Sequence, residues 1–350
     1  MEQRTIRIEA LTPLWTGGPG QTCDARMFET GLMGSLRWWF EACARSAGIA
    51  AADPTNAATL KYDPKHENLL EPVSRVFGCT GWRRRFRLVI CDRQPLEIPR
   101  EVEIDTEWHR GPKGQTNKAK WYYGRPLSDR PGPVRAWGSF NLKIVQIAPW
   151  TEYDGTSTDL LLDLIRFVSR YGMMCAKPQL GLGVVKLPED GVTDGFPALK
   201  DWLDRRRGSA PPDDPDLPSL DDFLYLECPV LPRQDGERED PDGWRSTFKW
   251  KYQFRSRYKV APTWETFRHT LAGYTRPLPI RSKVFISHPY GEGEDRAHRV
   301  VAWLPGNLRD AFAGLPKGQT DMKGTLEDDV KAFFLKDATE RAIWPLSSKL

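Results

Sequence analysis

The alternation of apolar and polar positions predicts strands and helices interleaved along the first half of the chain. Strand-like spacing, with apolar residues at every second position, occurs in four short segments: 5–11, 86–91, 139–147 and 184–187. Two longer segments, 30–47 and 158–174, carry apolar residues every three or four positions, which is the period of an amphipathic helix. The predicted order is therefore strand, helix, strand, strand, helix, strand.

This order is that of the ferredoxin-like motif. The second half repeats it less completely, with predicted strands at 223–231, 280–288 and 298–304 and a final helix at 326–341. We therefore predict an α+β protein with two tandem ferredoxin-like domains. The first domain spans residues 1–187 and the second spans residues 222–350.

The segment between these domains, 188–221, is rich in Pro, Asp and Gly and is predicted to be an acidic linker. Charge is segregated around it. Residues 187–243 contain sixteen acidic and six basic side chains, whereas residues 245–283 contain ten basic side chains and one acid. Such segregation indicates an acidic connecting region beside separate basic surfaces.

The segment 244–259 has two readings. Its aromatic residues alternate with Lys and Arg, as on a strand, yet Trp244, Phe248, Phe254 and Tyr258 also suit a helix. A repeat of the first domain requires a helix at this point, so we favour the helix.

Composition excludes several classes of protein. The six cysteines form no CxxC pair and the five histidines are scattered, which argues against a zinc site and a disulfide framework. The charged N-terminal residues do not form a signal peptide, and no apolar run approaches the roughly 20 residues that span a bilayer. Phosphate-loop, zinc-protease and serine-hydrolase motifs are missing. We expect a cytoplasmic, non-enzymatic protein without cofactor, metal or membrane contact.

The sequence TGLMGSLRWWF at residues 30–40 is the strongest candidate for binding chemistry. It opens a helix, with Thr30 as a possible N-cap, and a helix start attracts phosphate through unpaired backbone N–H groups. Gly31 and Gly34 would allow close approach, and Arg37 could grip a phosphate with two nitrogens. Alternatively, Arg37 is a solvated residue held by a nearby carboxylate. Of the aromatics that follow, Trp38 is expected to be the most exposed.

Other candidates are basic or glycine-rich. Residues 108–125 combine five cations, among them Lys113 and Lys120, with aromatic rings and no acid, which suits single-stranded RNA or a solvated loop equally well. Arg85 and Arg87 should share one face of a strand, opposite Phe86. That basic face could contact RNA or the acids of a neighbouring subunit.

Four motifs occur in order along the first half: LTPLWTGG (11–18), TGLMGSLRWWFEA (30–42), VFGCTGW (76–82) and QLGLGVVK (179–186). Together they resemble the RAMP superfamily of CRISPR proteins. The tryptophan-rich form of the first two is most similar to the family of first subunits of the Cmr complex, the type III-B effector. In the second half, RPLPIRSKVFISH (276–288) and RVVAWLPGNL (299–308) resemble the second domain of that family.

This resemblance implies two ferredoxin-like domains that bind RNA in a ribonucleoprotein effector complex for antiviral defence. The expected role is to hold the 3′ region of the CRISPR RNA and to help capture target single-stranded RNA, beside other RAMP subunits. In the RAMP pattern the loop after the second helix lies across the sheet from the start of the first. Many members have lysine where this chain has Met33, which shifts the expected phosphate contact to Arg37.

The expected RNA-binding residues come from this groove and from the basic segments. They are Gly17, Gly18, Gly31, Gly34, Arg37, Trp38, Lys113, Lys120, Lys177, Gly181, Gly183 and Arg281. The Gly181 to Gly183 loop could also be an ordinary turn after a helix.

Two alternatives to a binding role stay open. In RAMP backbone subunits of type III complexes, an aspartate in a loop comparable to that of Asp24 cleaves target RNA, so Asp24 is a candidate for a metal-dependent nuclease. A lone aspartate in a glycine-rich loop is also a common turn former. The fourteen tryptophans would equally suit a structural subunit that contacts neighbouring proteins without touching RNA.

Overall fold

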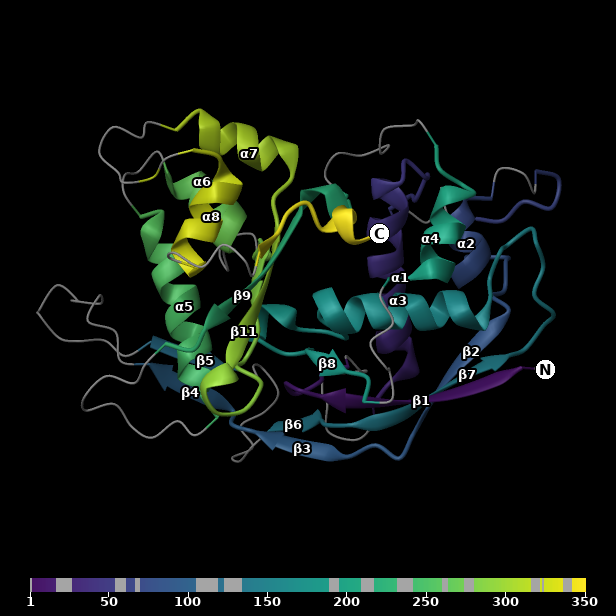
Figure 1. Cartoon of the computed structure of the whole chain (residues 1–350), viewed down its shortest axis with the longest axis horizontal. Helices are drawn as coiled ribbons and strands as arrows, with labels where there is room; N and C mark the ends of the chain where they lie inside the picture. Colours follow the sequence, from purple (N-terminus) through teal and green to yellow (C-terminus); the bar gives the residue numbers. More distant parts are fainter. Residues whose placement is uncertain are drawn as a thin grey trace, which may run out of the picture.

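The computed structural model describes residues 2–16, 27–53, 61–66, 70–104, 119–122, 134–188, 195–208, 217–231, 242–259, 264–273, 280–315, 322, 324–335 and 342–350. These residues form two four-stranded antiparallel sheets, two smaller strand pairs and the helices that cover the sheets (Figure 1). The α+β class is therefore confirmed. Within the described ranges, none of the helices is long and apolar enough to cross a membrane.

The first sheet has the strand order β2-β7-β1-β8. Its strands are β1 (Gln3–Ala10), β2 (Phe86–Cys91), β7 (Phe140–Gln146) and β8 (Val185–Lys186). Alternation along β2 buries Phe86 and Leu88 and exposes Arg87, as the sequence predicted. The apolar face packs against α1 (Glu29–Ser46) and α3 (Thr158–Tyr171).

Both long helices of this half start close to their predicted positions. In α3 the Ser157 hydroxyl accepts a hydrogen bond from the Leu160 N–H at 3.0 Å and so caps the helix. In α1 the N-cap is Phe28, with no side-chain cap, so the prediction of Thr30 as N-cap is wrong. Gly172 ends α3 where a Cβ would lie 2.8 Å from the Trp39 indole, so only a glycine lets the two helices approach this closely.

Several elements lie outside the predicted pattern. They are α2 (Pro72–Phe77), β3 (Pro95–Ile98), β4 (Glu101–Ile104), β5 (Ala119–Tyr122), β6 (Val134–Trp137) and α4 (Pro197–Asp204). The helix α4 falls inside the predicted linker. Its Leu199 and Trp202 are buried in the first-half core beside α3, so this part of the segment predicted as a linker forms a helix. The division of the chain at 187 and 222 stays a prediction.

The second sheet has the order β10-β11-β9-β12. Its strands are β9 (Phe223–Pro229), β10 (Val284–Ile286), β11 (Ala297–Trp303) and β12 (Ala342–Ile343). Its helices are α5 (Trp244–Arg257), α6 (Glu265–Ala272), α7 (Gly306–Ala313) and α8 (Leu326–Leu335). The helical reading of 244–259 is therefore confirmed by α5.

Both faces of the second sheet are covered. Along β9, Leu224 and Leu226 point into the core formed with the second-half helices, whereas Phe223 and Tyr225 point into the core of the first half. The ring centroids of Trp39 and Phe223 are 5.6 Å apart. Figure 1 shows β9 and β11 between α5 on one side and α1 and α3 on the other. The two halves therefore share a continuous apolar interface.

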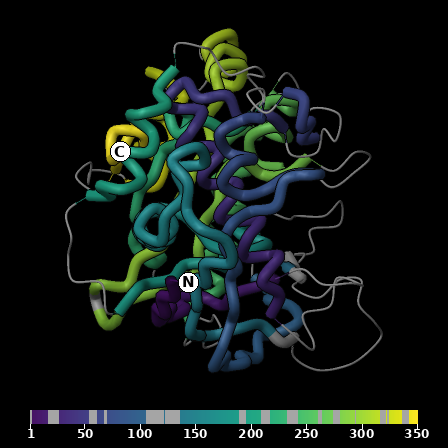
Figure 2. Tube along the Cα trace, turned by 90° about the vertical axis from the view of Figure 1, so that its right-hand side faces the viewer, coloured from purple at the N-terminus to yellow at the C-terminus, as the bar shows by residue number. Residues whose placement is uncertain are grey.

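The last described residues also pack on the first half. Leu346, in a 3-10 helix at Leu346–Lys349, is fully buried in the first-half core. The Ser347 hydroxyl donates a hydrogen bond to the Asp221 carboxylate at 2.6 Å. In Figure 1 this yellow C-terminal segment lies beside the teal 3-10 turn Leu220–Asp222, and Figure 2 shows the same end of the chain from the side. The interface thus involves segments far apart in the sequence.

Candidate nucleic-acid interface

The loop after β1 and the loop between α3 and β8 are joined by backbone hydrogen bonds. The Gly183 N–H donates to the Pro13 carbonyl at 3.0 Å, and the Ala176 N–H donates to the Trp15 carbonyl at 2.7 Å. The loop after β1 then leads to the start of α1. The structure therefore brings the two predicted glycine-rich segments together, as far as their residues are described.

The first turn of α1 packs closely on Thr16. The buried Thr16 hydroxyl accepts a hydrogen bond from the Phe28 N–H at 3.1 Å. A Cβ at Gly31 would lie 3.2 Å from the Thr16 Cβ, which is tighter than an ordinary contact, so glycine favours this close approach. Gly34, one turn later, is exposed, and a Cβ there would meet nothing within 4 Å. Packing therefore explains Gly31 but not Gly34; Gly17 and Gly18 lie outside the described residues.

Backbone geometry explains the other two predicted glycines. Gly183 has φ +103°, and a Cβ there would overlap the Met174 carbonyl oxygen. Gly181 has φ +93°, and its carbonyl accepts a hydrogen bond from the His288 N–H at 2.8 Å. Both residues adopt conformations that favour glycine. The turn reading of this loop is supported, while its contact with RNA stays a prediction.

Lys177 places a fixed positive charge at the same junction. Its backbone is left-handed, with φ +62°, and its ammonium nitrogen lies 3.8 Å from the centre of the Trp15 ring. This is a cation–π geometry, and the Trp15 ring itself is buried. The charge of Lys177 is therefore held beside the glycine loops.

Arg37 is engaged inside the protein. Its Nε donates to the Glu41 carboxylate at 2.8 Å, and its Nη1 donates to the Gly78 carbonyl at 2.7 Å. Its side chain is 17% exposed. Burial raises the pKa of Glu41, and the hydrogen bond from Arg37 opposes that change. The carboxylate partner is confirmed, although Arg37 is half-buried rather than solvated, and its contact with RNA stays a prediction.

Trp38 is half-buried and lies at the interface between the halves. Trp39 and Phe40 are buried, so the expectation that Trp38 is the most exposed of the three is confirmed. Its ring centroid lies 5.8 Å from that of Phe223 in an edge-on arrangement. The ring therefore stabilises the interface, and its contact with RNA stays a prediction.

The remaining basic candidates lie on other elements. Lys120 is in β5, opposite Glu103 of β4, and the next residue, Trp121, stacks on Phe248 of α5 with centroids 4.8 Å apart. This strand pair therefore packs against the second half. Arg281 is exposed shortly before β10, whereas Lys113 lies outside the described residues.

Sequence reasoning missed a polar contact that joins the two halves next to Gly181. The Lys251 ammonium donates to the Gln179 carbonyl at 2.8 Å, and burial lowers the pKa of Lys251 to about 7. His288 stacks on Trp244, with centroids 4.5 Å apart, and burial lowers its pKa well below the usual range. The Lys251 contact has no local sequence signal, because Gln179 lies in the other half of the chain.

Metal ligands are not clustered in the part of the chain that the structure describes. There, no group of three or more His, Cys, Asp or Glu side chains is placed to hold a metal ion. Asp24, the candidate nuclease residue, lies outside the described residues.

Comparison with known families identifies the first half. A family model described as the RAMP superfamily matches residues 7–186, just over half of the chain. The chain belongs to the RAMP superfamily. The matched RAMP range runs from β1 to β8 and so includes the first sheet, α1, α3 and both glycine-rich loops. No curated protein sequence matches this RAMP protein.

Similar solved structures include two proteins from Pyrococcus furiosus and one larger complex. Cmr1 (apo form) is 14% identical, covering 98% of this chain and 99% of its own, with a TM-score of 0.46. A chain of the type III-B Cmr-beta complex bound to cognate target RNA is 10% identical, covering 86% of this chain and 94% of its own, with a TM-score of 0.40. Cmr6 is 13% identical, covering 53% and 97%, with a TM-score of 0.26.

Proposed function

We propose that this RAMP protein is an RNA-binding subunit of a type III-B CRISPR effector complex. In this role it holds the 3′ region of the CRISPR RNA and helps capture target RNA, beside other RAMP subunits in the cytoplasm. Membership of the superfamily and the order of the four first-half motifs support this assignment. The chain binds RNA in this proposal and does not cleave it.

The proposal includes two tandem ferredoxin-like domains. Both sheets have the same strand order. If the four strands of each sheet are numbered as they occur along the chain, the order across the sheet is 2-3-1-4 in both. In the first half α1 and α3 connect the strands that the ferredoxin-like motif joins by helices, and in the second half α5 to α8 occupy the corresponding connections. This shared order supports a repeat of one unit.

Gly34 carries the argument for RNA at the start of α1. It is exposed on the second turn of the helix, and no described residue lies within 4 Å of the place that its Cβ would take. Glycine weakens a helix interior by about 1 kcal/mol relative to alanine. The Ser35 hydroxyl accepts a hydrogen bond from the Cys175 N–H at 3.0 Å, so the loop that carries Lys177 lies beside this turn. The positive end of the helix and the Lys177 ammonium both favour a phosphate in this region. An approaching RNA backbone would use the space that a side chain at 34 would fill.

The test changes the charge at position 34 alone. Gly34→Glu, Gly34→Lys and Gly34→Ala all fit the open space, so each variant should fold. Binding of a fluorescent single-stranded RNA by the full chain should weaken in the Glu variant and strengthen in the Lys variant. The alanine variant measures the effect of filling the space without charge. For the wild type, affinity should fall with salt, with a log–log slope of about −0.7 per phosphate contacted.

The groove assignment fails if the Glu and Lys variants bind RNA equally well. RNA binding as a whole fails if the wild-type chain shows no salt-dependent affinity for single-stranded RNA. Cleavage is tested separately with labelled RNA and Mg²⁺. Cutting that is lost in Asp24→Ala would replace the binding role with the nuclease alternative.

The purely structural alternative loses one of its supports. Among the described residues, every tryptophan side chain is buried or half-buried, and many pack within the chain. Trp39 and Trp202, for example, lie in the first-half core. Tryptophan content therefore reflects the interior of this protein as much as any surface for neighbours.

A further inference from the structure

A second charged surface lies at the other end of the first sheet. Residues 82–85 lead into β2, whose first residue, Phe86, pairs with Gln146 at the end of β7. That end of the sheet is where β1 begins, because Gln3 pairs with Val145. The glycine-rich loops follow the opposite end of β1, eight residues and about 26 Å away at 3.3 Å per residue. The two surfaces are therefore separate.

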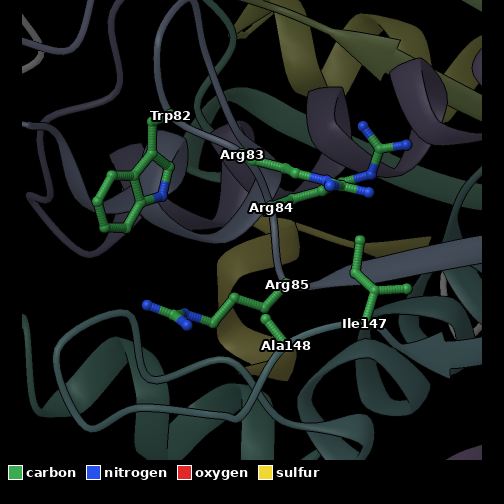
Figure 3. A pocket seen from close by; sticks show the side chains of 6 residues that line it. All are labelled: Trp82, Arg83, Arg84, Arg85, Ile147 and Ala148. Atoms are coloured by element: carbon green, nitrogen blue, oxygen red, sulfur yellow. The ribbon is translucent and has the colours of Figure 1, made fainter.

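An open pocket of about 240 Å³ marks this surface (Figure 3). Its lining residues are Trp82, Arg83, Arg84, Arg85, Ile147 and Ala148. Figure 3 shows the Arg83 and Arg84 side chains extending to one side of the segment and Trp82 and Arg85 to the other. The volume is below the roughly 300–1,000 Å³ of ordinary ligand sites, so the pocket suits one group of a larger partner.

The arginines of this pocket differ in how they are paired. Arg85 forms an ion pair with the buried Asp154 and donates to the Pro149 carbonyl at 3.1 Å. Arg83, Arg84 and Arg87 have no carboxylate within ion-pair distance in the described part of the chain. Arg83 and Arg87 lie close enough to Arg84 to repel its charge. The cluster therefore carries uncompensated positive charge.

Arg84 is the least well compensated of these arginines. Its Nε is shielded from solvent and has no hydrogen-bond partner among the described residues. Burial, followed by the charges of Arg83 and Arg87, lowers the pKa of Arg84. A shielded, unpartnered guanidinium N–H beside like charges is costly, and a bound anion would supply both the missing acceptor and the missing charge.

Aromatic rings surround Trp82, on the side of the segment opposite the Arg83 and Arg84 side chains (Figure 3). The Trp82 ring lies between those of Tyr62 and Tyr153, with centroids 5.1 and 6.1 Å away. The Tyr153 side chain is 37% exposed, and few other large apolar side chains of the described residues are exposed. The Arg75 guanidinium lies 4.2 Å from its ring centre. Cations beside accessible rings are the combination that binds single-stranded nucleic acid through phosphate and base.

We propose that Arg83 and Arg84 hold a backbone phosphate of a single-stranded RNA, and that the strand crosses the segment so that one of its bases packs against Tyr153 on the Trp82 side. The site adds a second contact, distinct from the glycine-rich groove, and rests on the proposed function for the identity of the strand. Paired guanidiniums match the oxygens of a phosphate, and ring faces accept any base. The aromatic surface favours RNA over an acidic protein segment, which would use the cations alone.

The test compares two double variants of the full chain. Arg83→Gln with Arg84→Gln removes the unpaired cations. Arg205→Gln with Arg207→Gln is the matched control, because it removes two exposed arginines that already pair with Asp201 and Asp204 at 2.9 Å. Binding of inorganic pyrophosphate is measured by calorimetry, and binding of fluorescent single-stranded RNA by anisotropy between 50 and 200 mM KCl.

The pocket variant should bind pyrophosphate and RNA at least about tenfold more weakly than wild type, since each bond to a charged group is lost. Its log–log salt slope for RNA should be smaller in magnitude by about 0.7, and the control should match wild type. Circular dichroism establishes that both variants are folded. Equal pyrophosphate and RNA binding by the two double variants would overturn the proposal.

Further outcomes separate the proposal from the function on which it rests. If wild type binds RNA but only the position-34 variants change that affinity, the groove stands and this site is overturned. If the pocket variant loses pyrophosphate binding and wild type binds poly-glutamate in place of RNA, the anion is a carboxylate and the RNA assignment is overturned. Crosslinking of 4-thiouridine RNA to Tyr153 or Trp82 would support the assigned strand directly.

Discussion

Acid should destabilise this protein through His298, which is fully buried in β11. Its Nδ1 lies 2.8 Å from the Ser287 carbonyl, which can only accept, so Nδ1 carries the proton. Its Nε2 lies 2.8 Å from the Ser246 hydroxyl, which already accepts the Leu231 N–H at 2.9 Å. In the neutral ring Nε2 is an acceptor, and the Ser246 hydroxyl donates its proton to it.

Burial lowers the pKa of His298 from its usual 6.5 to about 4. Because the folded pKa lies below the unfolded one, the unfolded chain takes up the proton first as the pH falls. Stability should therefore be full above pH 6.5 and decline until about pH 4. At about 1.4 kcal/mol per pH unit, the loss is roughly 2 kcal/mol at pH 5 and about 3 kcal/mol in full.

Urea unfolding at pH 7 and pH 5 measures this loss. The wild type should lose about 2 kcal/mol more between the two pH values than His298→Gln, which has no imidazole at this position. His66→Gln is the matched control, since the His66 side chain is 60% exposed, and it should behave as wild type. An equal loss in wild type and His298→Gln would refute the reasoning.

Three further changes test the interior. Gly183→Ala should lower the free energy of unfolding by about 1–3 kcal/mol or more in urea, because φ is +103° and the Met174 carbonyl is in the way; a neutral result would contradict the strain. Arg299→Leu removes the 2.7 Å bond to the Gly172 carbonyl at the end of α3 and should cost about 2–3 kcal/mol by thermal unfolding. Trp39→Ala should cost about 3–5 kcal/mol by urea titration, far more than a surface change.

Regular local patterns predicted the elements that carry the fold. The alternation of Phe86, Arg87 and Leu88 places β2 correctly, and the amphipathic period from 158 onward places α3. These signals work because each residue's burial follows from its place in the element's own period. The strands that form both sheets were predicted this way except β12, which has two residues.

Features that depend on distant partners were missed. Nothing local marks α4 as a helix of the first core, because Trp202 is buried by residues that precede it by more than 150 positions. The sequence suggested a nearby carboxylate for Arg37 but not its bond to the Gly78 carbonyl, which lies 41 positions away. Pairing of that kind is set by the tertiary fold, so spacing along the chain carries no signal for it.

The pocket before β2 was visible in part from the sequence. The run of three arginines was visible in the sequence, but the pairing of Arg85 with Asp154 distinguishes it from Arg83 and Arg84. That distinction arises from a loop about 70 residues later in the chain. Sequence predicts a basic surface there, and structure shows which charges remain unbalanced.

The interface between the halves has a consequence for synthesis on the ribosome. The face of α1 and α3 that carries Trp39 is covered by β9 and β11, and β11 ends roughly 130 residues after α3. At about 5–20 residues per second, the ribosome needs roughly 7–26 s to make that stretch. During this interval the newly made first half presents a tryptophan-rich face to the cell. Chaperone binding or aggregation during translation should therefore begin at this face.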